Sequence, residues 1–475
     1  MAESSKKLKI TFCSGAQSVT GANYLLEDLE TGRKFLIDCG LVQGEKIAED
    51  TNWQPLPYDP KEIEILFITH VHIDHIGRIP RLINEGFKGK IYSTLPSKDL
   101  AYPMLEDTMN ILKRDTIHGL DKIYTEENIK KAMNLWQGFL FRETIDLGDG
   151  LTATFRNSGH ILGSAMIEFQ VNGPSTKLPR QSSGQIGAGK KIVFTGDLGN
   201  SPSPILPDTE EITDADYLIM ESVYGDKNHE SKSERKKKLE EVIEDNTKRK
   251  GTLMIPTFSL ERTQELLFEI NDLIENNRVP MVPFFLDSPL AIKLTDIYRK
   301  YSDYFNDIAR QKIKAGDDIF VFPGLKETME TEQSKMILKM ANPKIIIAGS
   351  GMSSGGRIIH HEKNYLPDPN NTILLTGYQS VGTLGRLIEE GVKQVRIEGT
   401  EVPIRARIVK IEGYSGHKDS DNLLKFVQNT SETIKKVFIV MGEPKSALFL
   451  VQKLRDYLAI DAVNPKDGES VEIDV

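Results

Sequence analysis

The sequence has little of what several protein classes require. Its two cysteines, Cys13 and Cys39, are too few for a disulfide framework or a cysteine-rich zinc site, and suit a reducing cytoplasm. No run of about 18 apolar residues occurs, and the polar N-terminus lacks the apolar segment of a secretory signal, so we expect a cytoplasmic protein without a membrane partner. Because the net charge is −9, a polyanionic substrate would require a locally basic groove.

The length predicts more than one domain, since single cores stop growing near roughly 250–300 residues and this chain has 475. Up to about Tyr224, strand patterns with Gly-rich turns accompany helical patterns in "SKDLAYPMLEDTMNILKRD" and "TEENIKKAMNLWQGF". Strands then alternate with helices, which is typical of a parallel sheet covered on both faces. Strand patterns return after about residue 395. This order predicts a first domain split into 1–224 and 394–475, with an inserted α/β domain at 225–393.

Two polar stretches have simple interpretations. "NGPSTKLPRQSSGQIGAGKK" is rich in Gly, Ser, Lys and Pro, and predicts a long, disordered hairpin loop between two strands. "KSERKKK" favours a solvated helix face over an RNA contact.

The stretch "THVHIDHIG", residues 69–77, is the strongest chemical signal. It follows the apolar strand pattern "EILFI", and residues two apart in an extended segment point the same way, so His70 and His72 can face one ion. Asp74 and His75 follow at a turn and can serve a second ion. From the stretch alone, one closed tetrahedral site is also compatible with these four side chains.

Three further polar residues sit where strands end. His160 lies in "RNSGHILGS" and His417 in "YSGHKDS", both Gly/Ser-rich turns, and either histidine alone would suit a solvated surface. Asp197 follows the apolar strand in "KIVFTGDLGN", where an Asx turn before Gly199 is the alternative.

Taken in order along the chain, "FLIDCG" at Asp38, "THVHIDH", His160, Asp197 and His417 resemble the metallo-β-lactamase superfamily. The resemblance implies a four-layer αββα sandwich and two zinc ions, with Mn²⁺ or Fe²⁺ also suiting these ligand types. It assigns His70, His72 and His160 to the first zinc, Asp74, His75 and His417 to the second, and Asp197 as the carboxylate between them. Asp38 is implied as a residue that supports the histidines without binding metal.

The predicted insert resembles the β-CASP branch, whose members process nucleic acids. The stretches that carry this resemblance are "ESVYGD", "GSGMSSGGRIIHHEKNYL", "TGYQSVGTLGRLI" and "YSGHKDSDNL". Glu221 matches the acidic residue of motif A and His417 matches motif C, where a histidine resembles RNA-directed members and a valine the DNA-directed Artemis type. RNA is therefore the expected partner, and the sequence is also compatible with a homodimer.

The resemblance suggests a hydrolytic mechanism with one position in doubt. A di-metal site generates hydroxide at neutral pH, Asp74 would orient it, and Glu221 would hold a catalytic His417 in its charged form. The polyadenylation-factor endonuclease has a histidine in the stretch similar to "GTLGRLI", where this chain has Leu387. A proton donor is missing there; His361 or the adjacent His360 is one replacement, and water is another.

Two Gly-rich turns after apolar strands can cradle phosphate with backbone N–H groups. The predicted substrate contacts are Ser350, Gly351, Ser353, Ser354, Gly355 and Arg357 in the first turn, and Ser380, Gly382 and Thr383 in the second.

These observations predict a zinc-dependent ribonuclease that acts in RNA processing or decay. A metallo-hydrolase of a small thioester or lactam and a non-catalytic RNA-binding scaffold are the alternatives.

Overall fold

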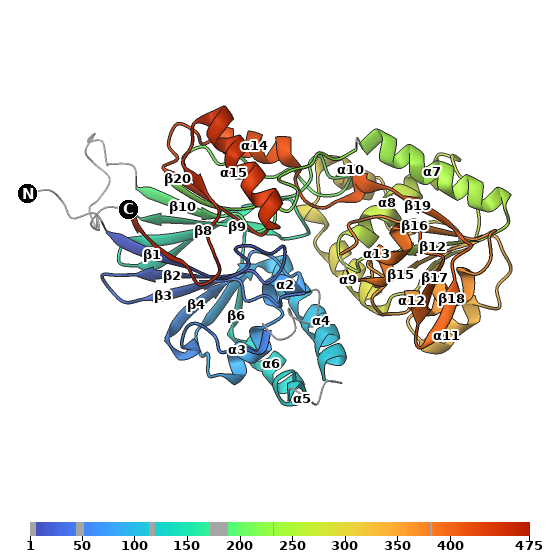
Figure 1. Ribbon diagram of the computed structural model, residues 1–475, viewed down its shortest axis with the longest axis horizontal. Coiled ribbons are helices and arrows are strands. Elements are labelled where there is room, and N and C mark those ends of the chain that lie inside the picture. The colour runs from blue at the N-terminus through green and yellow to red at the C-terminus, as the bar shows by residue number, and fades with distance from the viewer. Residues whose placement is uncertain (1–5, 44–51, 114–118, 172–188, 231, 381) are drawn as a thin grey trace, which may run out of the picture.

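The computed structural model describes residues 6–43, 52–113, 119–171, 189–230, 232–380 and 382–475, which form two regions side by side (Figure 1). One region contains two seven-stranded sheets. The first runs in the order β22 (Ser470–Asp474), β1 (Lys7–Ser14), β2 (Asn23–Asp28), β3 (Lys34–Ile37), β4 (Ile63–Phe67), β5 (Lys90–Thr94), β6 (Trp136–Phe139). The second runs in the order β21 (Ala462–Val463), β20 (Lys436–Val440), β11 (Tyr217–Glu221), β10 (Lys190–Phe194), β9 (Ala165–Val171), β8 (Leu151–Asn157), β7 (Thr144–Gly148).

Aromatic side chains join the inner faces of these two sheets. The rings of Phe67 on β4 and Phe169 on β9 lie edge to face with centroids 5.1 Å apart, and Phe169 also contacts Phe194 on β10. All three side chains are buried. Since burying one such side chain contributes about 1.5–3 kcal/mol, this layer holds the sandwich together.

Helices cover both outer faces (Figure 1). The first sheet packs against α3 (Ile79–Asn84), α4 (Leu95–Leu112) and α6 (Glu126–Leu135), and the second against α14 (Ser420–Gln428) and α15 (Pro444–Leu458). The short helices α2 (Ile73–Ile76) and α5 (Leu120–Ile123) lie beside α3 and α4, and η1 (Pro60–Glu62) precedes β4. The predicted four-layer αββα sandwich is therefore confirmed.

The other region contains the inserted parallel sheet, which is also confirmed. Its six strands run in the order β14 (Leu325–Glu327), β13 (Phe284–Leu286), β15 (Lys344–Ala348), β12 (Thr252–Pro256), β16 (Thr372–Leu375), β19 (Arg407–Lys410), and every neighbouring pair is parallel. Alternate side chains of β15 enter different cores. Ile345 and Ile347 pack on the side of α8 (Arg262–Glu275) and α9 (Pro289–Lys300), whereas Ile346 packs on the side of α12 (Ile358–Tyr365) and α13 (Leu384–Glu389).

The remaining elements of the insert surround this sheet. They are α7 (Lys232–Lys248), α10 (Asp307–Lys314), α11 (Thr331–Ile337), η2 (Ser302–Tyr304) and the ribbon β17 (Gln394–Ile397) with β18 (Thr400–Pro403), and η3 (Glu412–Tyr414) follows β19. No helix in the described part of the chain is long and apolar enough to cross a membrane.

The structure refines two sequence-based expectations and leaves a third untested. The helical pattern expected through "WQGF" ends at Leu135, because Trp136 pairs with Ile91 as strand β6 and its indole N–H donates to Ser93. The insert's sheet includes β19, so we propose that the insert extends beyond residue 393 to about Lys410. Most of the predicted long hairpin loop, residues 172–188, lies outside the described residues.

Candidate active site

The side chains predicted to bind metal, the metal-type residues, lie where strands of both central sheets end. They are His70, His72, Asp74, His75, His160, Asp197 and His417. His70 follows β4, His72 is the residue that precedes α2, and Asp74 and His75 lie within α2. His160 occupies the turn between β8 and β9, where its backbone N–H donates to Ser164 Oγ at 3.0 Å. Asp197 and His417 complete the group from the segments after β10 and η3, so residues far apart in the sequence meet at one place.

Three of these imidazoles, those of His70, His75 and His160, are each held by a hydrogen bond at Nδ1. Asp38 Oδ2 accepts from His75 at 2.7 Å and from the Thr69 hydroxyl at 2.7 Å, and that hydroxyl oxygen accepts from His70 at 3.1 Å. The carbonyl oxygen of Gly416 accepts from His160 at 2.9 Å. Carboxylate or carbonyl partners of this kind fix the ring orientation of metal-binding histidines.

The opposite ring nitrogens converge on Asp197. The Nε2 atoms of His70, His75 and His160 lie 3.4, 3.4 and 3.5 Å from its carboxylate oxygens. His72 Nδ1 lies 3.1 Å from His70 Nε2 and 3.2 Å from His160 Nε2.

The donor set fits divalent metal. His70, His72, His160 and Asp197 each offer a ligand atom within 4.8 Å of the others. His75 Nε2 and Asp197 Oδ1 are buried and have no hydrogen-bond partner among the described residues. Orphaned buried polar atoms of this kind require a compensating group, and histidine with carboxylate ligation suits zinc.

Electrostatics place the first group in the protonation state that ligation needs. Burial lowers the pKa of His70, His72 and His160 well below the ordinary value, so their imidazoles are neutral. Burial alone would raise the pKa of Asp197, but the neighbouring His75 and His70 hold it well below its usual range. Neutral imidazoles and an ionised carboxylate are the forms that bind metal.

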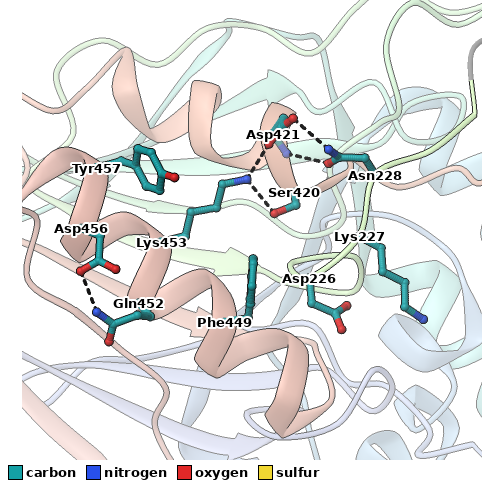
Figure 2. A pocket seen from close by; sticks show the side chains of 10 residues that line it. All are labelled: Asp226, Lys227, Asn228, Ser420, Asp421, Phe449, Gln452, Lys453, Asp456 and Tyr457. Atoms are coloured by element: carbon teal, nitrogen blue, oxygen red, sulfur yellow. Dashed lines mark hydrogen bonds and ion pairs between the residues drawn. The ribbon is translucent and has the colours of Figure 1, made fainter.

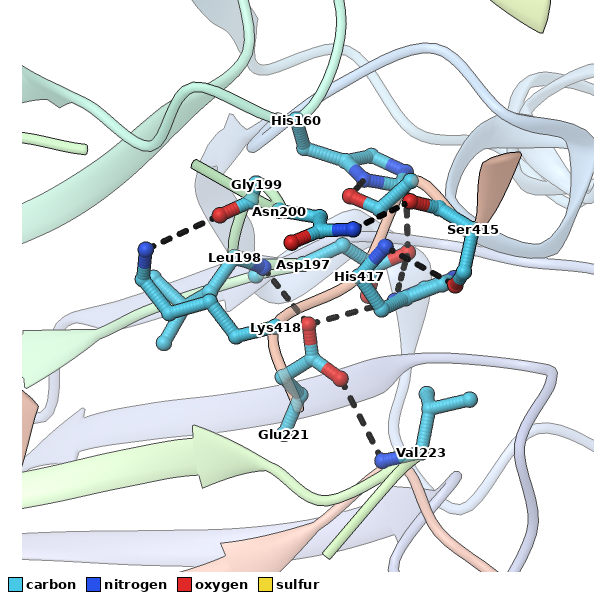
Figure 3. A network of polar contacts seen from close by, with 12 residues as sticks. His160, Asp197, Leu198, Gly199, Asn200, Glu221, Val223, Ser415, His417 and Lys418 are labelled. Carbon is cyan, nitrogen blue, oxygen red and sulfur yellow. Dashed lines mark hydrogen bonds and ion pairs between the residues drawn. The ribbon is translucent and has the colours of Figure 1, made fainter. Parts of the chain in front are cut away.

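A second group forms around His417 (Figure 3). Asp197, Glu221 and His417 offer ligand atoms within 4.8 Å of one another, and Glu221 Oε1 accepts from His417 Nδ1 at 3.2 Å. Backbone N–H groups of Leu198 and Val223 donate to the two Glu221 oxygens. Burial would lower the pKa of His417, but the Glu221 and Asp197 carboxylates raise it to about 9.

Asp74 is the most loosely connected member. Its Oδ2 lies 4.0 Å from His75 Nε2, and burial raises its pKa to about 6. The structure thus gathers all the side chains predicted as ligands in one place, while their division between two ions stays a prediction.

A cleft of about 260 Å³ opens onto this cluster. His72, Asp74, His160, Asp197 and His417 line it from the first domain. The insert lines the other side, from the segment after β12 and the ends of β15 and β16. Binding crevices of parallel sheets form at these carboxyl ends of the strands.

Part of this wall consists of residues that the sequence patterns did not single out. These lining residues are Tyr224, Phe258, Glu261, Arg262, Met352 and Tyr378. The signal was the "FSLER" stretch directly after β12, since the strand-end rule that singled out the Gly-rich turns applies there equally. Among the described residues that line the cleft, Arg262 is the only Lys or Arg side chain, so these walls do not form the locally basic groove expected for a polyanionic substrate.

The two predicted phosphate turns face the cleft unequally. Ser380 lines it. Ser353 is buried and donates to Glu362, and the Arg357 guanidinium donates to Asp287 and to backbone carbonyl groups. Ser353 and Arg357 therefore hold the first turn in place. The other predicted contacts in the described part of the turns are not among the lining residues: Ser350, Gly351, Ser354, Gly355, Gly382 and Thr383.

His361 lies inside the insert, away from the cleft. Its Nε2 donates to Asp287 at 2.7 Å, and its side chain is 2% exposed inside the insert. The adjacent His360 is exposed and lies 3.6 Å from Glu398. Leu387 is 42% exposed on α13. None of the three is among the described residues that line the cleft.

The basic run on α7 is only partly solvated. Arg235 is buried, and its guanidinium donates to Glu269 and to the carbonyl oxygen of Gly413. Lys236 and Lys238 form ion pairs with Asp272 and Glu230. This run therefore holds α7 against its neighbours.

A second hollow of about 400 Å³ lies between residues 226–228 and α15 (Figure 2). Its polar groups engage one another: Lys453 donates to Ser420 and Asp421, and Asn228 donates to Asp421. The metal-type residues do not line it, so we place the chemistry in the first cleft.

Family models match three parts of the chain. A model of the metallo-β-lactamase superfamily matches residues 19–170, and a model of the Beta-Casp domain matches residues 263–388. A third, described as a Zn-dependent metallo-hydrolase RNA specificity domain, matches residues 401–465.

Similarity to individual proteins extends over most of the chain. The chain is 34% identical over 443 residues to Ribonuclease TTHA0252 of Thermus thermophilus, which covers 93% of this chain and 95% of the relative. It is 32% identical over 468 residues to an RNase J-like protein of Methanocaldococcus jannaschii, covering 98% and 99%. Transcription termination factor FttA of the same organism is 28% identical over 476 residues, covering 98% of this chain and 72% of the relative.

Proposed function

This chain belongs to the metallo-β-lactamase superfamily, among its RNA-specific metallo-hydrolases with a β-CASP domain, and from this premise we propose that it is a zinc-dependent ribonuclease of RNA processing or decay. The observation that carries the proposal is the position of the metal-type cluster. It lies in a cleft that the first domain and the insert line together, so the insert can select a substrate for the hydrolytic centre.

In this proposal, His70, His72, His160 and Asp197 hold one zinc ion, and Asp74, His75, His417 and Asp197 hold the other. When bound, the ions supply hydroxide at neutral pH and offset negative charge on the phosphate. Asp38 and Glu221 accept hydrogen bonds from His75 and His417, which fixes the rings for binding. Mn²⁺ or Fe²⁺ suits the same ligand types.

A metal-controlled cleavage assay tests this function. Labelled RNA is incubated with metal-stripped protein, with and without added Zn²⁺ or Mn²⁺. We expect metal-dependent cleavage that His72→Ala abolishes, while His360→Ala, a histidine exposed on the insert, retains it. RNA left intact under all metal conditions would refute the proposal. Turnover of a thioester or lactam would then identify a small-molecule hydrolase, and metal-independent RNA binding a scaffold.

Product lengths define the mode of cleavage. RNAs carrying a 5′ hydroxyl, monophosphate or triphosphate are compared. A ladder of mononucleotides identifies exonuclease activity, and internal fragments identify endonuclease activity. Sedimentation of the same preparation tests the proposed homodimer.

A further inference from the structure

The cleft contains one acidic side chain that the metal cluster does not use. Among the described residues that line it, the carboxylic acids are Asp74, Asp197 and Glu261. Asp74 and Asp197 belong to the cluster. Leu387 and His361 do not reach the cleft, so the proton for the leaving group must come from another residue or from water.

Glu261 has an unusual backbone conformation. It precedes α8 with φ 62° and ψ −57°, a region that residues with a side chain rarely adopt. The residue is nevertheless only 7% exposed, and it lines the cleft. A strained backbone conformation persists only where surrounding contacts hold it, and such residues cluster at functional sites.

The hydrogen bonds of Glu261 distinguish its two oxygens. The Tyr298 hydroxyl accepts from the backbone N–H of Leu162 at 3.2 Å and donates to Glu261 Oε2 at 2.5 Å. Oε1 is buried and has no partner among the described residues. A proton on the carboxyl group therefore belongs on Oε1. Leu162 lies in the same turn as His160, so the hydrogen bond from Leu162 to Tyr298 connects the insert to the turn that carries His160.

From this geometry we propose that Glu261 is the general acid that protonates the leaving oxygen during RNA hydrolysis. The inference rests on the proposed ribonuclease function. Hydroxide forms a bond to phosphorus, the bond from phosphorus to the leaving ribose oxygen breaks, and the electron pair stays on that oxygen. The oxygen takes the Oε1 proton. One proton went to solvent when water became hydroxide, and the resulting Glu261 carboxylate takes up one proton from solvent, so the protons balance.

The surroundings keep this carboxyl protonated near neutral pH. Burial, followed by the neighbouring Glu265 carboxylate, raises the pKa of Glu261 to about 8, while Tyr298 and Arg262 oppose that rise. An acid with a pKa near the working pH is well suited to proton transfer. A neutral Glu261 carboxyl also avoids placing another negative charge beside the phosphate.

The test compares two substrates that differ in their need for a proton. The leaving group of RNA needs one, whereas the nitrophenolate of bis(p-nitrophenyl) phosphate does not. With zinc-loaded protein, we expect Glu261→Gln to lower kcat on RNA by about a hundredfold or more with little change in KM. On the nitrophenyl ester the loss should shrink to a few-fold. Glu275→Gln, exposed at the C-terminal end of α8 and outside the cleft, is the control.

A second variant covers a folding defect in the first. Tyr298→Phe keeps the Glu261 carboxyl and removes a hydrogen bond that lowers its pKa, so the fall of kcat on RNA at alkaline pH should move to higher pH. Three results would overturn the inference. The alkaline fall of kcat could stay at the same pH in Tyr298→Phe, Glu261→Gln could lose the same factor of kcat on both substrates, or Glu261→Gln could cleave RNA as fast as the unmodified protein. Failure of the ribonuclease proposal itself is distinguishable, because the unmodified protein would then leave RNA intact.

Discussion

Four histidines of the cluster share one arrangement at the scale of single residues. Each uses Nδ1 for a hydrogen bond, with Thr69, Asp38, Gly416 and Glu221 as the respective acceptors for His70, His75, His160 and His417. Such partners fix the orientation of each ring, so less side-chain entropy is lost when metal binds. Asp38 is central because it receives hydrogen bonds from Thr69 as well as His75.

We predict that Asp38→Ala weakens zinc binding by about 10–100-fold, since outer partners of ligands typically contribute that much. Affinity is measured by competition with a chelating dye. Asp59→Asn removes a surface carboxylate that caps η1 and should bind zinc like the unmodified protein. An Asp38→Ala affinity equal to that control would show that His75 needs no such support.

Glu362, under the first Gly-rich turn, predicts a pH effect on stability. Burial raises the pKa of Glu362 to about 8, above its ordinary value of 4.5. The folded state therefore holds a proton that the unfolded state releases between about pH 4.5 and 8, and stability falls as pH rises through this window. Glu362→Gln removes that loss. Its Tm relative to the unmodified protein should rise between pH 5 and 8.5, whereas Glu332→Gln, exposed on α11, should show no such trend.

Residues differ in how far the sequence alone predicts them. His70, His72, Asp74 and His75 share one short stretch, so their spacing is visible directly. Asp197 and His417 were identified through the order of separated motifs. Glu261 carries no such pattern, because its importance arises from a cleft that exists only after the insert folds against the first domain.

At the scale of elements, strand ends do most of the positioning. The core strands β4, β10 and β15 each end in a short apolar run, "ILF", "IVF" and "IIIA", and a polar segment follows each run at the end of the strand. This regularity made the elements and their functional ends predictable. The exception is β6, whose "WQGF" continues a helical pattern until Trp136 finds buried partners in the sheet. Long-range pairing of this kind overrides local periodicity.

One close backbone contact determines how α2 meets the strands. A Cβ atom on Gly40 would lie 1.6 Å from the Asp74 carbonyl oxygen. We predict that Gly40→Ala displaces Asp74 and His75 and lowers the zinc content of purified protein by about half, with loss of RNA cleavage. Zinc is measured by mass spectrometry.

Gly316→Ala is the control for that substitution. It carries the cost of a φ of 95°, but a Cβ there would meet nothing within 4 Å. Full zinc content is expected. Equal zinc content in both variants would mean that α2 can move without losing its ligands.

At the scale of the whole molecule, the insert divides the first domain into two sequence segments that meet again at the metal cluster. The sandwich and the inserted sheet were predictable from the order of strand and helix patterns. The boundary was harder to predict, because "ARIVK" has the pattern of a strand but not the identity of its sheet. Only pairing with β16 assigns it to the insert. Direct interactions across the two regions include Lys300 with Asp99 and Asn306 with the carbonyl oxygen of Ile205.

Metal binding should therefore stabilise the molecule as a whole. The proposed ligands come from residues 70–197 and from His417, so zinc links the segments on either side of the insert. A ligand that binds only the folded state contributes about 2.7 kcal/mol at 100 times its Kd. We predict a Tm that rises steadily as zinc is added to metal-stripped protein. His72→Ala should flatten this rise and His360→Ala should leave it intact. The Tm is measured by calorimetry. If zinc raises the Tm of His72→Ala as much as that of the unmodified protein, the stabilising zinc ions bind elsewhere on the protein.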